Sequence, residues 1–173
     1  ANKNNETYLK KLNFKYFIEV LSDQKKEVMF YSRSGTGDSY FLEQTSFYND
    51  VIGEKRITNT LDNIVEKNNL PLPDFIKIDT QGSEIDILKG AEKSISNCVL
   101  IYLECPIVEY NLGSPNLNGY IKYLNSIDFV SYDICEVHHI DKLLVQIDIL
   151  FLKKSIIKKI YPYKKLLNIL SKN

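Results

Sequence analysis

Cysteines and long apolar runs are scarce in this chain of 173 residues. The three cysteines, Cys98, Cys105 and Cys135, are odd in number and match no metal-binding spacing, so we expect reduced thiols in the core. No uninterrupted run of about eighteen apolar residues occurs, which argues against a membrane-spanning helix. The N-terminus lacks the basic-then-apolar layout of a signal peptide, so we expect a cytoplasmic protein.

The composition is typical of one globular domain with a single core, because 44% of the residues are hydrophobic and 25% are charged. The formal net charge of zero conceals an asymmetry. Residues 1–152 carry fifteen basic and twenty-two acidic groups, whereas seven lysines and no acids follow from Lys153 onward. The acidic body argues against nucleic-acid binding. A basic tail can make weak contact with an anionic membrane surface, and the alternative is a docked helix with a solvated lysine face.

We therefore expect a domain over residues 1–153 and a basic, amphipathic helical tail over residues 154–173, broken or kinked at Pro162. The chain opens without an initiator methionine, in a helical pattern with Tyr8, Leu9 and Leu12 on one side. This start indicates a fragment of a longer protein.

Hydrophobic patterning predicts alternating strands and helices. Strands are expected at residues 16–23, 26–32, 55–60, 74–79, 98–106, 129–137 and 142–154, and helices at residues 61–70, 83–97 and 120–127. Asn59 or Thr60 can cap the first of these helices, and Gly90 reads as a tolerated interruption of the second. The pair His138 and His139 is expected at the corner between the last two strands. The pattern predicts an α/β fold with an antiparallel edge strand.

Ligands in such sheets bind outside the carboxyl ends of the strands. Three segments reach that edge here: Ser22 with Asp23, residues 79–84, and residues 104–106. Gly82 lies where strand turns into helix, and it permits a positive φ or a close approach by a ligand. Glu84 falls in the first helical turn, where it can act as a capping acid or take part in chemistry.

Asp79 ends an otherwise apolar strand, and an acid there is costly unless it meets a partner, water or a cation. Lys77 lies two residues earlier and shares its face of the strand, so an ion pair between the two is one interpretation. A binding or catalytic site is the other.

The segment FIKIDTQGSEIDILKGAE resembles the signature of the FkbM family of S-adenosylmethionine-dependent methyltransferases. The matching positions are the charged residues, the glycines and the helix end, namely Lys77, Asp79, Gly82, Glu84, Leu88, Lys89, Gly90 and Ala91. Flanking segments are also similar to the family: VLSD before KKEVMFYS, Glu104 at the end of the next strand, and ILFLKK preceded by Gln146 and Asp148. The similarity spans most of residues 1–153.

The resemblance implies a class I methyltransferase (Rossmann-like) fold, a mostly parallel seven-stranded sheet with an antiparallel edge strand. Family members begin with a strand, a glycine-rich turn for the methionine part of the cofactor, and a second strand that ends in a ribose-binding acid. This chain opens just after that acid, so we expect a fold truncated at its N-terminus. Gln81 stands where the family usually has an acid.

The resemblance also implies S-adenosylmethionine as cofactor. We expect no metal, because the chain shows no metal-binding motif. Methyl transfer needs the acceptor oxygen held against the methyl carbon, and a carboxylate can accept the hydroxyl proton. Asp79 is the first catalytic candidate, Glu104 the second, and His138 or His139 the third, because adjacent histidines in a hairpin are more often solvated turn residues than ligands. HHID alone is also too short for a metal site. The expected cofactor-binding residues are Ser22, Asp23, Asp79 and Gly82. Turn capping is the alternative role of the first two.

The expected reaction is O-methylation of a hydroxyl on a small molecule, a sugar or a glycan, acceptor classes that come from the family. A nicotinamide-dependent oxidoreductase would need a glycine fingerprint that the chain lacks. A non-catalytic α/β module that has lost its cofactor site and binds a partner is the alternative from another class.

Overall fold

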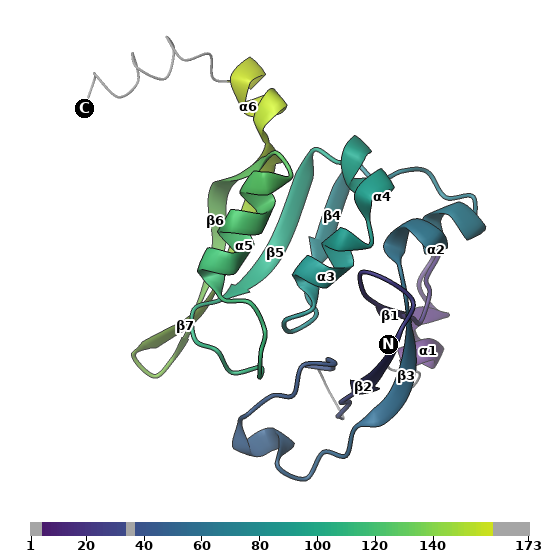
Figure 1. Ribbon diagram of the computed structural model, residues 1–173, viewed down its shortest axis with the longest axis vertical. Coiled ribbons are helices and arrows are strands. Elements are labelled where there is room, and N and C mark those ends of the chain that lie inside the picture. Colours follow the sequence, from purple (N-terminus) through teal and green to yellow (C-terminus); the bar gives the residue numbers. More distant parts are fainter. Residues whose placement is uncertain (1–4, 34–36, 161–173) are drawn as a thin grey trace. The chain divides into compact units, whose positions relative to one another are not determined.

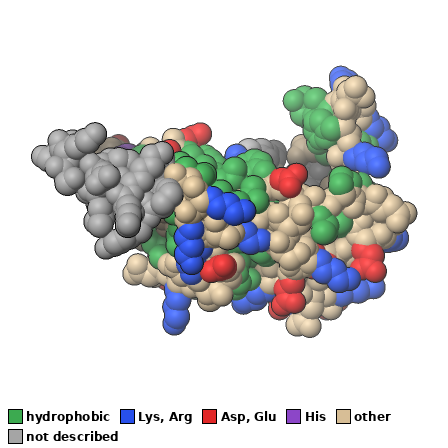
Figure 2. All heavy atoms as spheres, turned by 90° about the horizontal axis from the view of Figure 1, so that it is seen from above, with side chains coloured by type: hydrophobic (Ala, Val, Ile, Leu, Met, Phe, Trp, Pro, Cys, Tyr) green, Lys and Arg blue, Asp and Glu red, His purple; other side chains and the backbone are tan. Residues whose placement is uncertain are grey.

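The computed structural model describes residues 5–33 and 37–160, which fall into two compact units. Within these residues, no helix has both the length and the apolar character needed to cross a membrane. Acidic, basic and hydrophobic side chains are all present on the face drawn in Figure 2.

The first unit comprises Ala1–Leu72, Asp79–Ser96 and Glu109–Ser114. Its three-stranded sheet has the order β1-β3-β2, with β1 parallel and β2 antiparallel to β3. The strands are β1 (Val20–Leu21), β2 (Glu27–Phe30) and β3 (Glu54–Asn59). The helices are α1 (Glu6–Leu9), the 3-10 turn η2 (Ser46–Tyr48), α2 (Leu61–Lys67), α3 (Glu84–Lys89) and α4 (Glu92–Asn97), whose last residue belongs to the second unit.

Local chemistry explains where α2 begins. Thr60 has extended backbone angles, and its hydroxyl accepts a hydrogen bond from the Asn63 N–H at 3.1 Å. This is the usual N-cap arrangement, in which a side-chain oxygen satisfies one of the first unpaired backbone donors. The predicted cap is therefore confirmed at Thr60.

The single helix expected over residues 83–97 is wrong, because Gly90 separates α3 from α4. A Cβ atom at Gly90 would lie 2.2 Å from the carbonyl oxygen of Ser22. The glycine thus lets the end of α3 approach the chain that follows β1, and the helix stops at that contact. What the pattern presented as an interruption is a close backbone approach.

The second unit comprises Pro73–Ile78, Asn97–Val108 and Pro115–Asn173. Its strands form one sheet in the order β4-β5-β7-β6 (Figure 1). They are β4 (Phe75–Ile78), β5 (Leu100–Pro106), β6 (Phe129–Ile140) and β7 (Leu143–Lys153), and the helices are α5 (Leu117–Ser126) and α6 (Lys154–Ile160). β4 is parallel to β5, and β7 is antiparallel to both β5 and β6.

The fold is therefore α/β, with both parallel and antiparallel strands. The antiparallel strand of the four-stranded sheet is β7, and it lies between β5 and β6, so the edge strands of this sheet are β4 and β6. The expected edge position of the antiparallel strand is wrong in this sheet, because the short β6–β7 connection places β6 outside β7. An antiparallel edge strand does occur in the three-stranded sheet, where it is β2.

One face of the four-stranded sheet packs against α5 (Figure 1). The alternation of β5 directs every second side chain into this core, which explains its burial pattern. The fully buried residues of the unit come from α5, three strands and the residue pair before β5, namely Cys98, Ile101, Leu103, Cys105, Tyr120, Leu124, Phe129 and Phe151. Asn116 caps α5 by accepting a hydrogen bond from the Gly119 N–H at 3.2 Å.

The corner between β6 and β7 lies at Asp141 and Lys142, so the corner expected at His138 and His139 is wrong. Both histidines belong to β6, where they pair with Gln146 and Leu144 of β7. Asp141 has a positive φ of 54°, a conformation that aspartate tolerates better than most residues. The turn therefore needs no glycine.

The cysteine prediction is confirmed for Cys98 and Cys105, which are buried and free, and wrong for Cys135, which is exposed. Burial raises the pKa of the Cys98 thiol. In the predicted basic tail, α6 forms a helix without a buried residue. Residues 161–173, with the predicted kink at Pro162, lie outside the described residues, as does the start of the chain before residue 5.

Candidate functional site

Residues 79–84 follow β4 in the chain and lead into α3, whose first residue is Glu84. We call this segment the 79–84 loop, and its conformation depends on Gly82. Gln81 and Gly82 both have positive φ angles, of 56° and 109°. A Cβ atom at Gly82 would lie 2.7 Å from the Cβ of Ser114 and 3.3 Å from the Phe41 ring. The prediction of a positive φ or a close approach at Gly82 is confirmed, and the approach comes from the protein itself.

Glu84 holds this loop from inside. Its side chain is buried, and its carboxylate accepts hydrogen bonds from the N–H groups of Thr80 and Gly82, both at 3.0 Å, and from the Thr80 hydroxyl at 3.2 Å. Hydrogen bonds of this kind offset the cost of burying a carboxylate. Glu84 was expected either to cap the helix or to take part in chemistry. These contacts favour a structural role, in which the carboxylate binds the backbone of the loop before α3.

The connection between β2 and β3, which carries Phe41, also brings Ser39 and Tyr40 to the surroundings of the loop. The Ser39 hydroxyl donates to the Gln81 carbonyl at 2.9 Å. The Tyr40 hydroxyl donates to the Asp86 carboxylate at 3.2 Å and lies 3.2 Å from the Ser22 hydroxyl. Burial, followed by the charge of Asp86, raises the pKa of Tyr40, so its hydroxyl stays protonated and available as a donor.

Ser22 and Asp23 directly follow β1. Ser22 is buried, its N–H donates to the Asn59 carbonyl at 2.9 Å, and its hydroxyl donates to Asp23 at 2.9 Å. The Lys26 ammonium lies 2.7 Å from the Asp23 carboxylate. This hydrogen bond from Lys26 is the main reason that the pKa of Asp23 lies below its usual range. The two residues therefore form a turn with an ionised acid.

A hollow of about 110 Å³ lies beside these groups in the first unit. Its walls combine apolar side chains from both sheet and helix with hydroxyl and carboxylate groups: Glu19, Val20, Leu21, Phe30, Asp38, Ser39, Tyr40, Thr80, Ser83 and Ile87. Apolar walls with a few polar groups are typical of small-molecule sites. None of the predicted residues lines this hollow, but Ser22, Asp79 and Gly82 each lie next in sequence to a lining residue. The Ser22 hydroxyl lies 3.2 Å from the Tyr40 hydroxyl, and Ser39 donates to the carbonyl of Gln81, the residue before Gly82.

Glu104 belongs to the second unit and lies on β5. Its carboxylate accepts a hydrogen bond from the Gln146 side chain of β7. Directly opposite Glu104 on β7 is Asp148, which accepts a hydrogen bond from the Tyr102 hydroxyl at 2.8 Å. Burial and the contact with Asp148 raise the pKa of Tyr102, which keeps the phenol protonated. Asp79 belongs to the first unit.

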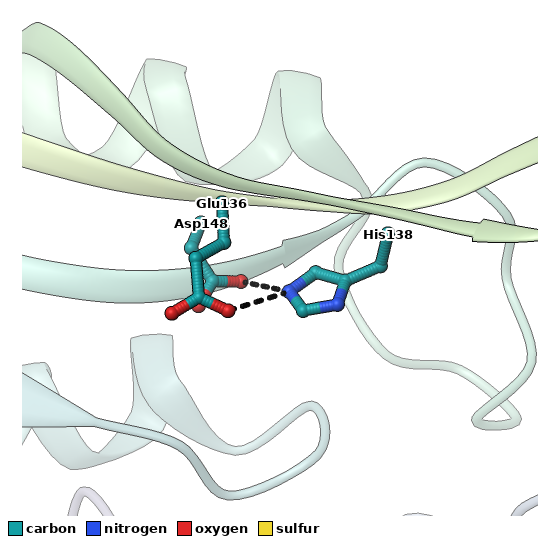
Figure 3. A group of neighbouring side chains, drawn as sticks. All are labelled: Glu136, His138 and Asp148. Carbon is teal, nitrogen blue, oxygen red and sulfur yellow. Dashed lines mark ion pairs between the residues drawn. The ribbon is translucent and has the colours of Figure 1, made fainter.

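The same sheet face carries His138 and Glu136 of β6 (Figure 3). The His138 Nε2 atom lies 3.3 Å from the Asp148 carboxylate and 3.6 Å from the Glu136 carboxylate. Of the two histidines, only His138 belongs to this group. The sequence did not predict Tyr102 and Glu136 as members of this group. The available signal was Gln146 and Asp148, two polar residues spaced by two in an apolar strand, which places both on one face.

Residues 12–130 match the family described as the methyltransferase FkbM domain, which is well over half of the chain. The chain belongs to the FkbM methyltransferase family. No curated protein and no solved structure matches it. The matched region of the FkbM domain includes the 79–84 loop, Ser22, Asp23 and Glu104, whereas Glu136, His138 and Asp148 lie beyond it. The family supports a methyltransferase with an α/β fold.

Proposed function

We propose that this protein is an S-adenosylmethionine-dependent O-methyltransferase that acts on a hydroxyl group of a small molecule, a sugar or a glycan. The observation that carries the proposal is the 79–84 loop within the FkbM region. Asp79 directly follows β4, Gln81 and Gly82 have positive φ angles, and the buried Glu84 carboxylate accepts hydrogen bonds from the loop backbone. Such rigid loops suit a site that must hold two reactants in register.

The residues around the hollow fit part of this cofactor. The hydroxyls of Ser39, Thr80 and Ser83 and the apolar walls of Val20 and Ile87 suit a flat ring with polar edges. However, 110 Å³ is below the range of roughly 300–1,000 Å³ that is usual for sites of whole small molecules. We infer that these residues hold one ring of the cofactor and that residues elsewhere hold the remainder.

When bound, the cofactor supplies a methyl group on a positively charged sulfur. We propose that the Asp79 carboxylate accepts the proton of the acceptor hydroxyl as methyl transfer proceeds, in the manner of a general base. The same negative charge favours a cationic donor. Glu104 is the second candidate, and its hydrogen bond from Gln146 and its position opposite Asp148 support an anchoring role instead.

The class I methyltransferase topology is also part of the proposal. It is supported by the parallel pairing of β4 with β5 and by the antiparallel last strand, β7. The excess of acids over residues 1–152 supports a hydroxylated small molecule or glycan as acceptor in preference to nucleic acid. A second candidate function is a non-catalytic α/β binding module, which the small volume of the hollow favours.

Calorimetric titration of S-adenosylhomocysteine into the full-length gene product tests the proposal. We expect binding at one site. Asp79→Asn should weaken S-adenosylmethionine, titrated in the same way, about tenfold or more because its sulfonium loses a nearby negative charge, and it should weaken S-adenosylhomocysteine, whose sulfur is neutral, much less. Asp141→Asn is the matched control, since it changes the same chemical group at the exposed hairpin corner and should leave the affinity unchanged. Absence of binding by the folded protein would favour the non-catalytic module.

A further inference from the structure

Three carboxylates lie in one row across the four-stranded sheet. Glu104 of β5 and Glu136 of β6 are both direct partners of Asp148, which lies on β7 between them. Direct partners in antiparallel strands point to the same face, and like charges placed opposite each other destabilise a sheet. Asp148 is also buried, with 7% of its surface exposed. A cation bound beside Asp148 would offset the repulsion between these carboxylates.

His138 completes the row with an imidazole nitrogen. It lies two residues after Glu136 on β6 and therefore on the same face. The pairing of β6 with β7 shifts before Glu136 and again after His138, so the two side chains sit between two irregularities of the strand. Bulges in strands are common where a side chain must be redirected. In Figure 3 the imidazole and the two carboxylates point toward one another.

The distances within this group match the edges of a metal coordination sphere. The His138 Nε2 atom is buried and makes no hydrogen bond within the part of the chain that is described. It is 3.3 Å from Asp148 Oδ1 and 3.6 Å from Glu136 Oε2, and all three ligand atoms lie within 4.8 Å of one another. Tetrahedral coordination with bonds of about 2.0–2.2 Å separates neighbouring ligand atoms by about 3.3–3.6 Å. A charge-assisted hydrogen bond would be shorter, about 2.7–2.9 Å.

Hydrogen bonds from neighbouring side chains hold the Asp148 carboxylate in place. The Tyr102 hydroxyl donates to Asp148 Oδ2 at 2.8 Å, which leaves Oδ1 directed at His138. The Gln146 amide donates to Asp148 Oδ1 at 3.2 Å and to Glu104, so it links the two carboxylates. Metal-binding carboxylates in proteins are typically fixed by hydrogen bonds of this kind.

We propose that Glu136, His138 and Asp148 bind one divalent transition-metal ion, with Zn²⁺ or Mn²⁺ as the chemical class. An imidazole with two carboxylates suits these ions, whereas Mg²⁺ and Ca²⁺ prefer oxygen ligands alone. Three protein ligands leave at least one coordination position for water or a substrate oxygen, as in many catalytic zinc sites. The site stands on its own residues, and it does not depend on methyl transfer.

Titration of ZnCl₂ into untagged, chelator-treated protein tests the proposal by calorimetry. We expect one Zn²⁺ per chain, weaker binding of MgCl₂, and a loss of Zn²⁺ affinity of about 100-fold or more in His138→Gln, since even residues outside the ligand set typically cost 10–100-fold. Tyr102→Phe, which removes the hydrogen bond to Asp148, should cost about tenfold. His139→Gln is the matched control and should bind Zn²⁺ as the unmodified protein does.

Two further variants make the result decisive. Cys135→Ser removes the exposed thiol nearest to the cluster in sequence and should retain full Zn²⁺ binding. Glu136→Gln alters an exposed ligand and should fold even if His138→Gln does not. It should lower the affinity at least tenfold. Absence of Zn²⁺ binding by the folded protein, equal losses in the two histidine variants, or loss in Cys135→Ser would overturn the proposal. None of these results bears on binding of S-adenosylhomocysteine.

Discussion

At the scale of single residues, Gly82 carries the most information, and Gly82→Ala tests it. Alanine would take a φ of 109° and place its Cβ 2.7 Å from that of Ser114, so we expect a loss in unfolding free energy of about 2–4 kcal/mol, from strain and overpacking together. Gly113→Ala is the control, because Gly113 also has a positive φ but nothing lies within 4 Å of its added Cβ. Chemical denaturation should show a clearly smaller loss for the control. Equal losses would mean that the contact with Ser114 is unimportant.

Asp23 gives a pH dependence whose sign is fixed by its lowered pKa. The folded carboxyl titrates below the unfolded value of about 3.9, so the stabilisation is present above that pH and is lost as the pH falls through the folded pKa. The difference in unfolding free energy between the unmodified protein and Asp23→Asn should therefore shrink on acidification. In a protein that already carries Lys26→Met, the effect of Asp23→Asn on the unfolding free energy should change little with pH. A difference that stays constant with pH would contradict the Asp23–Lys26 interaction.

Single residues also show what the sequence can and cannot predict. The need for glycine at position 82 follows from the strand-to-helix junction, whereas the side chains that crowd it, Ser114 and Phe41, come from distant segments. Likewise, the pattern predicts polar residues at Gln146 and Asp148, but the grouping with His138 and Glu136 depends on the register of β6 and β7. Register across strands is set by packing and turns together, and local sequence does not determine it.

At the scale of elements, the substitution Gly90→Ala tests whether Gly90 is an ordinary helix glycine or the point where α3 approaches the backbone of Ser22. In an ordinary exposed helix, glycine to alanine stabilises by about 1 kcal/mol. Here the added Cβ would lie 2.2 Å from the Ser22 carbonyl, so we expect Gly90→Ala to destabilise the protein instead. Thermal denaturation gives the sign directly. A gain in stability would mean that α3 and the chain after β1 are not in contact at this point.

Most elements of the fold were predictable, because capping signals and apolar periodicity act locally, as at Thr60 before α2. The errors arose where tertiary contacts decide. α3 and α4 are separated by a backbone approach, and β6 continues through His138 and His139 because it pairs with β7 over that length. The corner at Asp141 carries no glycine to mark it.

At the scale of the whole molecule, the FkbM region covers the candidate residues of the 79–84 loop and ends before the cluster on β6 and β7. The α/β class and the methyltransferase family were both predictable, because the signature from Lys77 to Ala91 joins a strand end to a helix end at fixed spacing. The division into sheets of three and four strands was not, since strand order depends on non-local pairing.

The central claim is methyl transfer to a hydroxyl, and transfer of an isotopically labelled methyl group measures it directly. The full-length gene product, labelled S-adenosylmethionine and a panel of hydroxylated small molecules and sugars should yield a labelled methyl ether. The variant Asp79→Asn should reduce kcat by about 10²-fold or more, as expected for loss of a general base, while Asp141→Asn should not. Absence of a labelled ether from every acceptor with a protein that binds the cofactor, or full activity in Asp79→Asn, would contradict the account.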